Sequence, residues 1–200
     1  MRMLNEYGRS MTEVLGILAI IAMISAGSLA GYSKGMRRYR LNEMISQTAQ
    51  MVVNIRGFYG NQDSYASLDD TTAVQYNIVT ERMVGEGSTL FNPYHGRIHF
   101  SLGSVVENGP ENTAFIITYR DLPVEACIGM ARTDWGYDEK YGFLGIAVGA
   151  NDEDPSYPRP INDFYRTSRL QEALTMHEAI TYCSGGIGDQ ARSTVALKFF

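Results

Sequence analysis

The segment that decides the fold reads VLGILAIIAMISAGSLA and covers residues 14–30. It lies within a run of twenty uncharged residues, 14–33, and the chain has no other run of this length. A helix rises about 1.5 Å per residue, so twenty residues span about 30 Å, the thickness of the hydrocarbon core of a bilayer. Helices in soluble cores rarely run so far without a charge, and we therefore predict a membrane-spanning helix.

The residues before this run differ from a secretory signal peptide. Such a peptide has a basic start, a short apolar stretch and a cleavage site of small residues. Here a polar segment, MRMLNEYGRSMTE, precedes an apolar run that is too long. Glu13 directly adjoins that run, where a carboxylate is costly unless it has a partner. One candidate partner is local, because Ser10 and Glu13 have capping-box spacing. The other candidate is a group on another chain, and Glu13 can have both partners at once.

Helical periodicity continues beyond the apolar run. Six side chains follow each other at steps of three and four, the spacing of one helix face: Leu41, Ile45, Thr48, Val52, Ile55 and Tyr59. The first proline in the chain is Pro93. We therefore predict one helix from about Ser10 to about Phe58, apolar in its first half and amphipathic in its second.

Composition narrows the class of protein. The chain has 200 residues, of which 44% are hydrophobic and 20% charged, and its net charge is −5. These values exclude wholesale disorder and argue against a broad basic surface for nucleic acid. Its two cysteines are too few for a disulfide-dense scaffold or a four-cysteine zinc site.

Motifs of catalysis and of cofactor binding are missing from the sequence, which has neither a GxSxG elbow nor a Walker loop. His95 and His99 form HGRIH, which lacks the glutamate and the helix of a zinc protease. Asp152, Glu153 and Asp154 lack EF-hand spacing and are typical of a solvated acidic loop, with calcium binding as the open alternative. We predict no enzyme activity, no cofactor and no metal site.

The second half of the chain has the alternation of β-strands. We predict four strands of an antiparallel sheet with one buried face, at residues 98–102, 114–120, 142–149 and 195–199. Residues 60–92 are more polar and less periodic. There we predict a connecting region with one short helix at about residues 68–83.

Two short helices are predicted between these strands, and each carries a cysteine. The first is expected to begin at Asp121 as its cap and to contain Cys127. The second is expected to begin at a capping box of Thr175 and Glu178 and to contain Cys183. The two cysteines would pair in an oxidising compartment, and two separate buried thiols are the alternative.

The segment GRSMTEVLGILAIIAMISAGSLAGYSKG resembles the start of a type IV prepilin or pseudopilin. The matching features are a short polar leader that ends in Gly8, a glutamate five residues later at Glu13, and an immediate apolar span. The resemblance implies that a prepilin peptidase cuts between Gly8 and Arg9 and that the new amine of Arg9 is N-methylated. It also implies that Glu13 pairs with the N-terminal amine of a neighbouring subunit. The family usually has an apolar residue where this chain has Arg9.

Part of the C-terminal half resembles the type IVb pilins. The segments that carry this resemblance are LPVEACIGMARTDWG, TMHEAITYCSGG and STVALKFF. It implies a disulfide between Cys127 and Cys183. It also implies an α+β pilin ladle fold, in which a long N-terminal helix packs on an antiparallel head with short helices. The expected domains are a leader at residues 1–8, a transmembrane and polymerisation segment at 9–33, an amphipathic helix at 34–59 and an extracytoplasmic head at 60–200.

The resemblance implies a structural function, as a subunit of a type IVb-like pilus that is held in the inner membrane and polymerised into a helical filament. The implied partners are further copies and other pilins, the prepilin peptidase, inner-membrane lipid, and an inner-membrane assembly platform with its ATPase. No specific nucleic acid or small molecule is predicted as a partner. Two alternatives stay open: a pseudopilin of a type II secretion system, and a signal-anchored periplasmic binding domain that does not polymerise.

The charges that flank the span favour the opposite topology. Four basic residues follow the span and two precede it: Lys34, Arg37, Arg38 and Arg40 after it, and Arg2 and Arg9 before it. By the positive-inside rule alone, the C-terminal part would lie in the cytoplasm. The resemblance implies a periplasmic head that later becomes extracellular, and we follow the resemblance.

Overall fold

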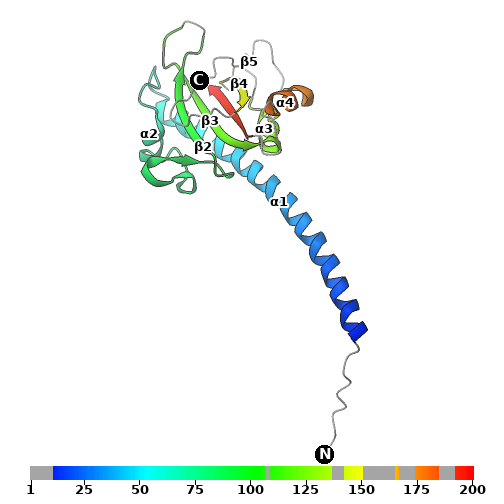
Figure 1. Cartoon of the computed structure of the whole chain (residues 1–200). Coiled ribbons are helices and arrows are strands. Elements are labelled where there is room, and N and C mark those ends of the chain that lie inside the picture. Colours follow the sequence, from blue (N-terminus) through cyan, green and yellow to red (C-terminus); the bar gives the residue numbers. More distant parts are fainter. Residues whose placement is uncertain (1–10, 107–108, 137–141, 151–164, 167–173, 185–191) are drawn as a thin grey trace, which may run out of the picture. The chain divides into compact units, whose positions relative to one another are not determined.

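The computed structural model describes residues 11–106, 109–136, 142–150, 165–166, 174–184 and 192–200. The chain divides after Tyr39 into two compact units, residues 1–39 and 40–200. The long helix α1, Met11–Tyr59, contributes its first half to one unit and its second half to the other (Figure 1).

Helix α1 is continuous over 49 residues, which confirms the predicted long helix to within one residue at each end. No proline interrupts it. Glu13 lies in its first turn and Arg56 in its last turn. These charges have the signs that favour the helix dipole, because an acid is stabilised near the N-terminus and a base near the C-terminus.

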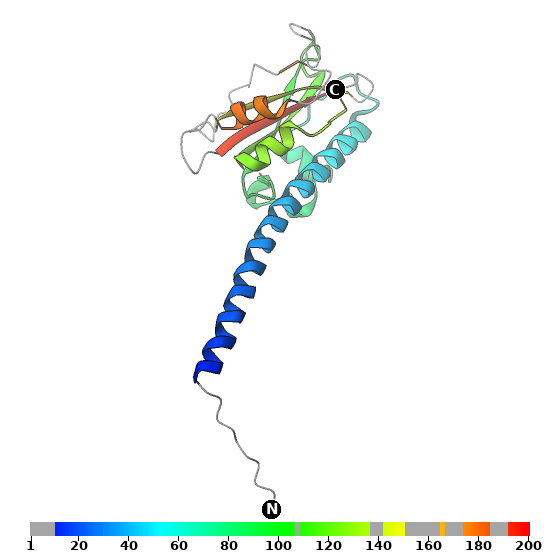
Figure 2. The same cartoon turned by 90° about the vertical axis from the view of Figure 1, so that its right-hand side faces the viewer.

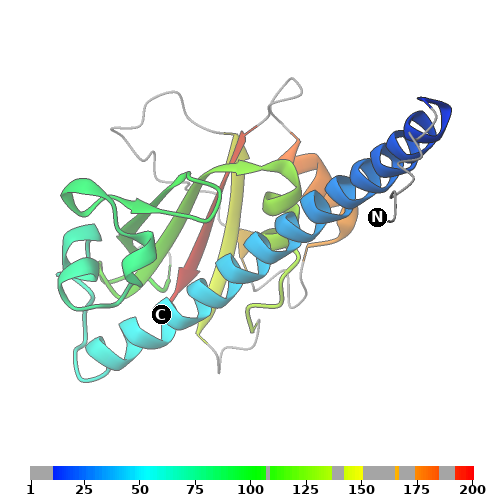
Figure 3. The same ribbon diagram turned by 90° about the horizontal axis from the view of Figure 1, so that it is seen from below.

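The second half of α1 packs along one face of the sheet (Figure 3). Its buried side chains include four members of the predicted stripe and two methionines that the stripe omitted: Thr48, Val52, Ile55, Tyr59, Met44 and Met51. The other two members, Leu41 and Ile45, are half-buried against the same core. The buried face is therefore wider than a single row of residues at steps of three and four, because the sheet covers a broad side of the helix.

The remaining elements follow α1 in chain order. Short helical elements come first: α2 (Asp70–Gln75) and the 3₁₀ turns η1 (Glu81–Met83) and η2 (Glu86–Ser88). Three strands and a helix follow: β1 (Leu90–Phe91), β2 (Arg97–Gly103), β3 (Ala114–Pro123) and α3 (Val124–Ala131). The last elements are β4 (Phe143–Ala150), β5 (Tyr165–Arg166), α4 (Met176–Cys183) and β6 (Arg192–Phe199).

The described strands form one antiparallel sheet in the order β1-β2-β3-β6-β4-β5. The last strand, β6, lies between β3 and β4, so that Leu197 is opposite Ile117 on one side and Ile146 on the other. All three side chains are at most 1% exposed. The four predicted strands are confirmed as β2, β3, β4 and β6, and a central β6 explains why the C-terminal strand is so apolar.

The predicted helix at residues 68–83 is wrong in its extent. Helix α2 has six residues and ends at Gln75, and η1 is a separate 3₁₀ turn. Asn77 has a φ of 54°, in the left-handed region that ends a helix. The side chain of Asp69 caps α2 by accepting the backbone N–H of Thr72 at 2.6 Å.

The predicted cap at Asp121 is also wrong. Strand β3 continues through Pro123, and α3 begins only at Val124. Asp121 has a φ of 57° and lies where the pairing of β3 with β6 is irregular, between Tyr119 and Leu122. A bulge in the strand, and not the start of a helix, accounts for the polar residue at this position.

Candidate assembly site

The first half of α1 exposes apolar side chains on every side. The exposed fractions of Leu15, Leu18 and Met23 are 64%, 55% and 73%. Gly27, Gly31 and Gly35 lie on one face, and outside the neighbouring backbone of the helix itself a Cβ atom added at any of them would meet no atom within 4 Å. Among the described residues, α1 is the one helix whose length and composition allow it to cross a membrane. This surface therefore needs lipid or other helices as its surroundings.

Glu13 is the single carboxylate of this apolar half. It is exposed in the first turn of α1, and within the described part of the chain it forms no ion pair. A carboxylate beside an apolar helix surface is costly in lipid, so its partner has to come from elsewhere. The predicted cleavage and methylation positions, Gly8 and Arg9, and the predicted capping residue Ser10 lie outside the described residues.

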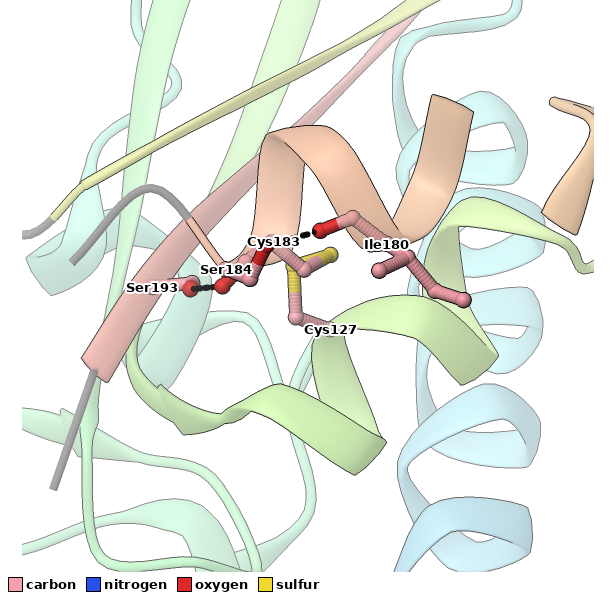
Figure 4. Close-up of a disulfide and its surroundings, with 5 residues drawn as sticks. All are labelled: Cys127, Ile180, Cys183, Ser184 and Ser193. Carbon is pink, nitrogen blue, oxygen red and sulfur yellow. Dashed lines mark hydrogen bonds between the residues drawn. A yellow bond between two sulfur atoms is a disulfide. The ribbon is translucent and has the colours of Figure 1, made fainter. Parts of the chain in front are cut away.

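In the second unit, a disulfide joins Cys127 of α3 to Cys183 of α4 (Figure 4). The Cα atoms are 5.8 Å apart, and neither cysteine is exposed. The two helices contact each other, with α3 against β6 and α4 against β4 (Figure 2). Ser193 at the start of β6 donates its hydroxyl to the backbone oxygen of Cys183 at 2.8 Å. The bond thus holds α3 and α4 together against the central strand.

The start of α4 is set by the predicted capping box, which the structure confirms. The backbone N–H of Glu178 donates to Thr175 Oγ1 at 3.4 Å, and the N–H of Thr175 donates to Glu178 Oε2 at 2.9 Å. The hydrogen bonds from Thr175 hold the pKa of Glu178 below its usual range. The ionised carboxylate is therefore the form that closes the helix end.

Helix α1 is attached to the sheet by a buried polar contact. Thr48 Oγ1 donates to the backbone oxygen of Met44 at 2.8 Å, and it lies 2.5 Å from the hydroxyl of Tyr119 on β3. Neither Thr48 nor Tyr119 is exposed. Burial raises the pKa of Tyr119 well above its ordinary value, and the hydrogen bond with Thr48 lowers it to a smaller extent. The tyrosine is therefore neutral and donates to the threonine oxygen.

Helix α3 packs closely on α1 at Gly129. A Cβ atom at Gly129 would overlap the side chain of Leu41. The absence of a side chain at Gly129 is thus what permits this close approach of the two helices.

The two histidines of HGRIH have separate surroundings. His99 Nδ1 lies 2.8 Å from Asp70 Oδ2, and Asp70 Oδ1 accepts the N–H of Phe100 at 2.7 Å, which ties α2 to β2. His95 is in the turn between β1 and β2 with a φ of 65°. Among the described residues, no group of three or more His, Cys, Asp or Glu side chains could hold a metal ion. The acidic residues 152–154 lie outside the described residues.

A comparison with protein-family models decides the family. The model described as PilS N terminal matches residues 38–197, which is most of the chain. The chain belongs to the PilS N-terminal family.

Individual relatives agree with this assignment. Two curated proteins, from Escherichia coli O111:H- and from Escherichia coli O127:H6, are each described as a major structural subunit of bundle-forming pilus. Each is 25% identical to this chain over 181 residues, which covers 89% of this chain and 88% of the relative.

Two solved structures were found to be similar to this chain. The type IV b pilin from Salmonella typhi matches with a TM-score of 0.53 at 20% identity, over 78% of this chain and 97% of that one. TcpA, a type IV pilin from Vibrio cholerae, matches with a TM-score of 0.47 at 15% identity, over 81% of this chain and 99% of that one. The likeness to the Salmonella typhi pilin confirms the predicted pilin fold, a long N-terminal helix and an antiparallel sheet with short helices.

Sequence patterns located the elements of the second unit but missed its specific contacts. The stripe of α1 includes Thr48, but nothing in the sequence pairs it with Tyr119, 71 positions away. His99 is noticed in HGRIH, but its partner Asp70 lies in a region with weak periodicity. A polar residue at a predicted core position, such as Thr48, is the one signal of such a contact, because a buried polar group needs a hydrogen-bond partner.

Proposed function

We propose that this protein is a structural subunit of a type IVb pilus. Support comes from the family assignment over residues 38–197 and from the pilin fold. The relatives described as major structural subunits of bundle-forming pilus support the same function. The protein polymerises with further copies of itself and with other pilins.

The observation that carries this proposal is the exposed apolar half of α1. A folded subunit in water does not tolerate a helix that is apolar on every side, so the helix lies first in the membrane and then among the helices of a filament. Moving from lipid to a helix bundle keeps the apolar surface out of water. Filament formation is thus a change of apolar surroundings and not an exposure to water.

The head lies outside the cytoplasm in this proposal. A buried disulfide between α3 and α4 is typical of an oxidising compartment, since thiols stay reduced in the cytosol. The span of α1 therefore crosses the inner membrane with the head in the periplasm. Assembly then carries the subunit to an extracellular pilus.

Processing prepares the subunit for assembly. The prepilin peptidase cuts between Gly8 and Arg9, and the amine of Arg9 is N-methylated. That amine then pairs with Glu13 of a neighbouring subunit, which compensates a carboxylate that is otherwise unpaired at the membrane edge. An inner-membrane platform with its ATPase drives the transfer into the filament.

The substitution Glu13→Gln tests this function, because it removes the charge and keeps the size of the side chain. We expect the variant to remain in the membrane and to be absent from the sheared surface fraction, since the incoming amine finds no partner. The matched control is Glu81→Gln, which removes one exposed acid from η1. This control is expected to assemble at the wild-type level.

Two results would contradict the proposal. Glu13→Gln pili at the wild-type level would contradict the assembly role of Glu13. Wild-type protein that stays in the periplasm under every growth condition would instead favour a pseudopilin. The amounts of protein in the membrane and in the sheared surface fraction therefore separate these cases.

A further inference from the structure

Three cations follow the apolar run of α1. Lys34, Arg37 and Arg38 are exposed, and we call residues 34–38 the basic segment. Lys34 is the first residue after the uncharged run. When that run fills the hydrocarbon core, the basic segment therefore begins at the depth of the lipid headgroups. It rises by only about 6 Å along the helix, so its three charges act on one headgroup layer.

Exposed tyrosines flank the basic segment on the same helix. Tyr32 is 68% exposed and Tyr39 is 57% exposed. Tyrosine concentrates at membrane–water interfaces, because its ring is apolar and its hydroxyl is polar. Two such rings, one before and one after the cations, independently place the basic segment at the interface.

The basic segment lies in a stretch of α1 that is rich in positive charge. The sequence has no carboxylate between Glu13 and Glu43, and Arg40 adds a fourth cation to the same stretch. Lys34 and Arg38 are four positions apart on the helix, where like charges repel. The positive-inside rule also disfavours this cluster on the outer side of the membrane. A bound anion on that side would compensate both costs.

We propose that the basic segment binds the phosphate groups of anionic phospholipids in the outer leaflet of the inner membrane. The inference rests on the membrane stage of the proposed function. Arginine forms paired hydrogen bonds with phosphate, and lysine attracts it as a point charge. The contact holds the span at a fixed depth while the subunit awaits assembly. Departure into a filament then requires these cations to exchange lipid phosphate for other partners.

The test uses the full chain reconstituted in bilayers, with spin-labelled phosphatidylglycerol or spin-labelled phosphatidylcholine as the probe. Electron spin resonance gives the ratio of the two lipids in the first shell around the helix. The test variant carries Lys34→Gln, Arg37→Gln and Arg38→Gln, since glutamine keeps helix propensity. The control carries Arg82→Gln, Arg97→Gln and Arg132→Gln, three exposed cations of the second unit, so both variants lose the same charge.

The wild type is expected to select phosphatidylglycerol by about twofold or more at low salt, and the selection should fall as salt screens the charges. The test variant is expected to insert equally well and to show a ratio near one. The control variant is expected to keep the wild-type ratio. Inorganic phosphate at constant ionic strength is expected to leave the ratio unchanged.

Other outcomes would overturn the proposal. An unchanged lipid ratio in the test variant would mean that other residues select phosphatidylglycerol. An equal loss of selection in the control variant would mean that the selection depends on net charge alone. Displacement by inorganic phosphate would indicate a site for free phosphate, and displacement by a DNA oligonucleotide would indicate a nucleic-acid site. A chain that does not insert would overturn the proposed function as well, whereas an inserted chain without selection would overturn the lipid contact alone.

Discussion

At the scale of single residues, the contact between Thr48 and Tyr119 is a buried polar link between α1 and the sheet. Both hydroxyl groups are buried, and each has the other as a partner. A buried hydroxyl that loses its partner costs more than the hydrogen bond itself contributes, because its desolvation is no longer offset.

We expect Thr48→Val to lower the free energy of unfolding by about 1–3 kcal/mol, because valine has the same shape and leaves the Tyr119 hydroxyl unpaired. The double variant Thr48→Val with Tyr119→Phe is expected to recover part of this loss, since it removes both polar groups. Thermal unfolding of the full chain in mild detergent measures all three proteins. A double variant that loses the sum of the two single effects would contradict the pairing.

The buried position of Tyr119 leads us to predict that the folded protein loses stability at alkaline pH. Burial raises its pKa in the folded state, so above the ordinary tyrosine value near 10 the unfolded chain releases this proton and the folded chain keeps it. Unfolding is then favoured, and stability falls as pH rises, by up to about 1.4 kcal/mol per pH unit. Tyr119→Phe is expected to have a flatter profile between pH 9.5 and 11 (roughly the titration range of the unfolded chain). Parallel profiles of stability against pH for the wild type and Tyr119→Phe would contradict this prediction.

The sequence predicts positions better than partners at this scale. Thr48 falls on the buried stripe of α1 because the spacing of helix positions fixes which side it occupies. Its partner depends on which strand crosses that helix, and the local pattern carries no such information. The bulge at Asp121 shows the same limit, since a short polar residue is favoured both at a helix cap and at the left-handed φ of this bulge.

At the scale of elements, the disulfide sets how α3 and α4 meet the central strand. It closes a loop over 56 positions, so its removal releases a long segment in the unfolded chain. The loop-entropy relation predicts a loss of about 4 kcal/mol for this length.

We expect Cys127→Ser with Cys183→Ser to lower the melting temperature strongly, and the wild type treated with a reductant to approach the same value. Thr175→Ala is a useful comparison, because it removes only the cap of α4 and is expected to cost about 1 kcal/mol. Melting curves of the three proteins in the same detergent measure the difference. A serine double variant that melts with the wild type would show that packing alone holds the two helices.

Element boundaries follow from the sequence where local chemistry is decisive. Thr175 and Glu178 form their capping box within four residues, and the structure has it as predicted. The region at residues 68–83 has no such signal, and its division into α2 and η1 depends on the left-handed turn at Asn77 and on packing against the sheet. The strand order likewise depends on the whole sheet. The residues of β6 alone therefore do not predict its central position.

At the scale of the whole molecule, the first half of α1 has an apolar surface that a single chain leaves exposed. The second unit has its own core, a disulfide and an antiparallel sheet. We propose that the first half supplies the means of association and that the second unit supplies a stable folded head. In the proposed pilus, these two requirements are met by different stretches of one sequence.

Intact-mass spectrometry of the sheared extracellular fraction tests this account most directly. The expected mass is that of residues 9–200, heavier by one methyl group on Arg9 and lighter by the two hydrogens of a formed disulfide. That single mass combines the processing at Gly8, the oxidised head and the assembly into a surface filament. A chain found only in the membrane, with residues 1–8 still attached, would contradict the account.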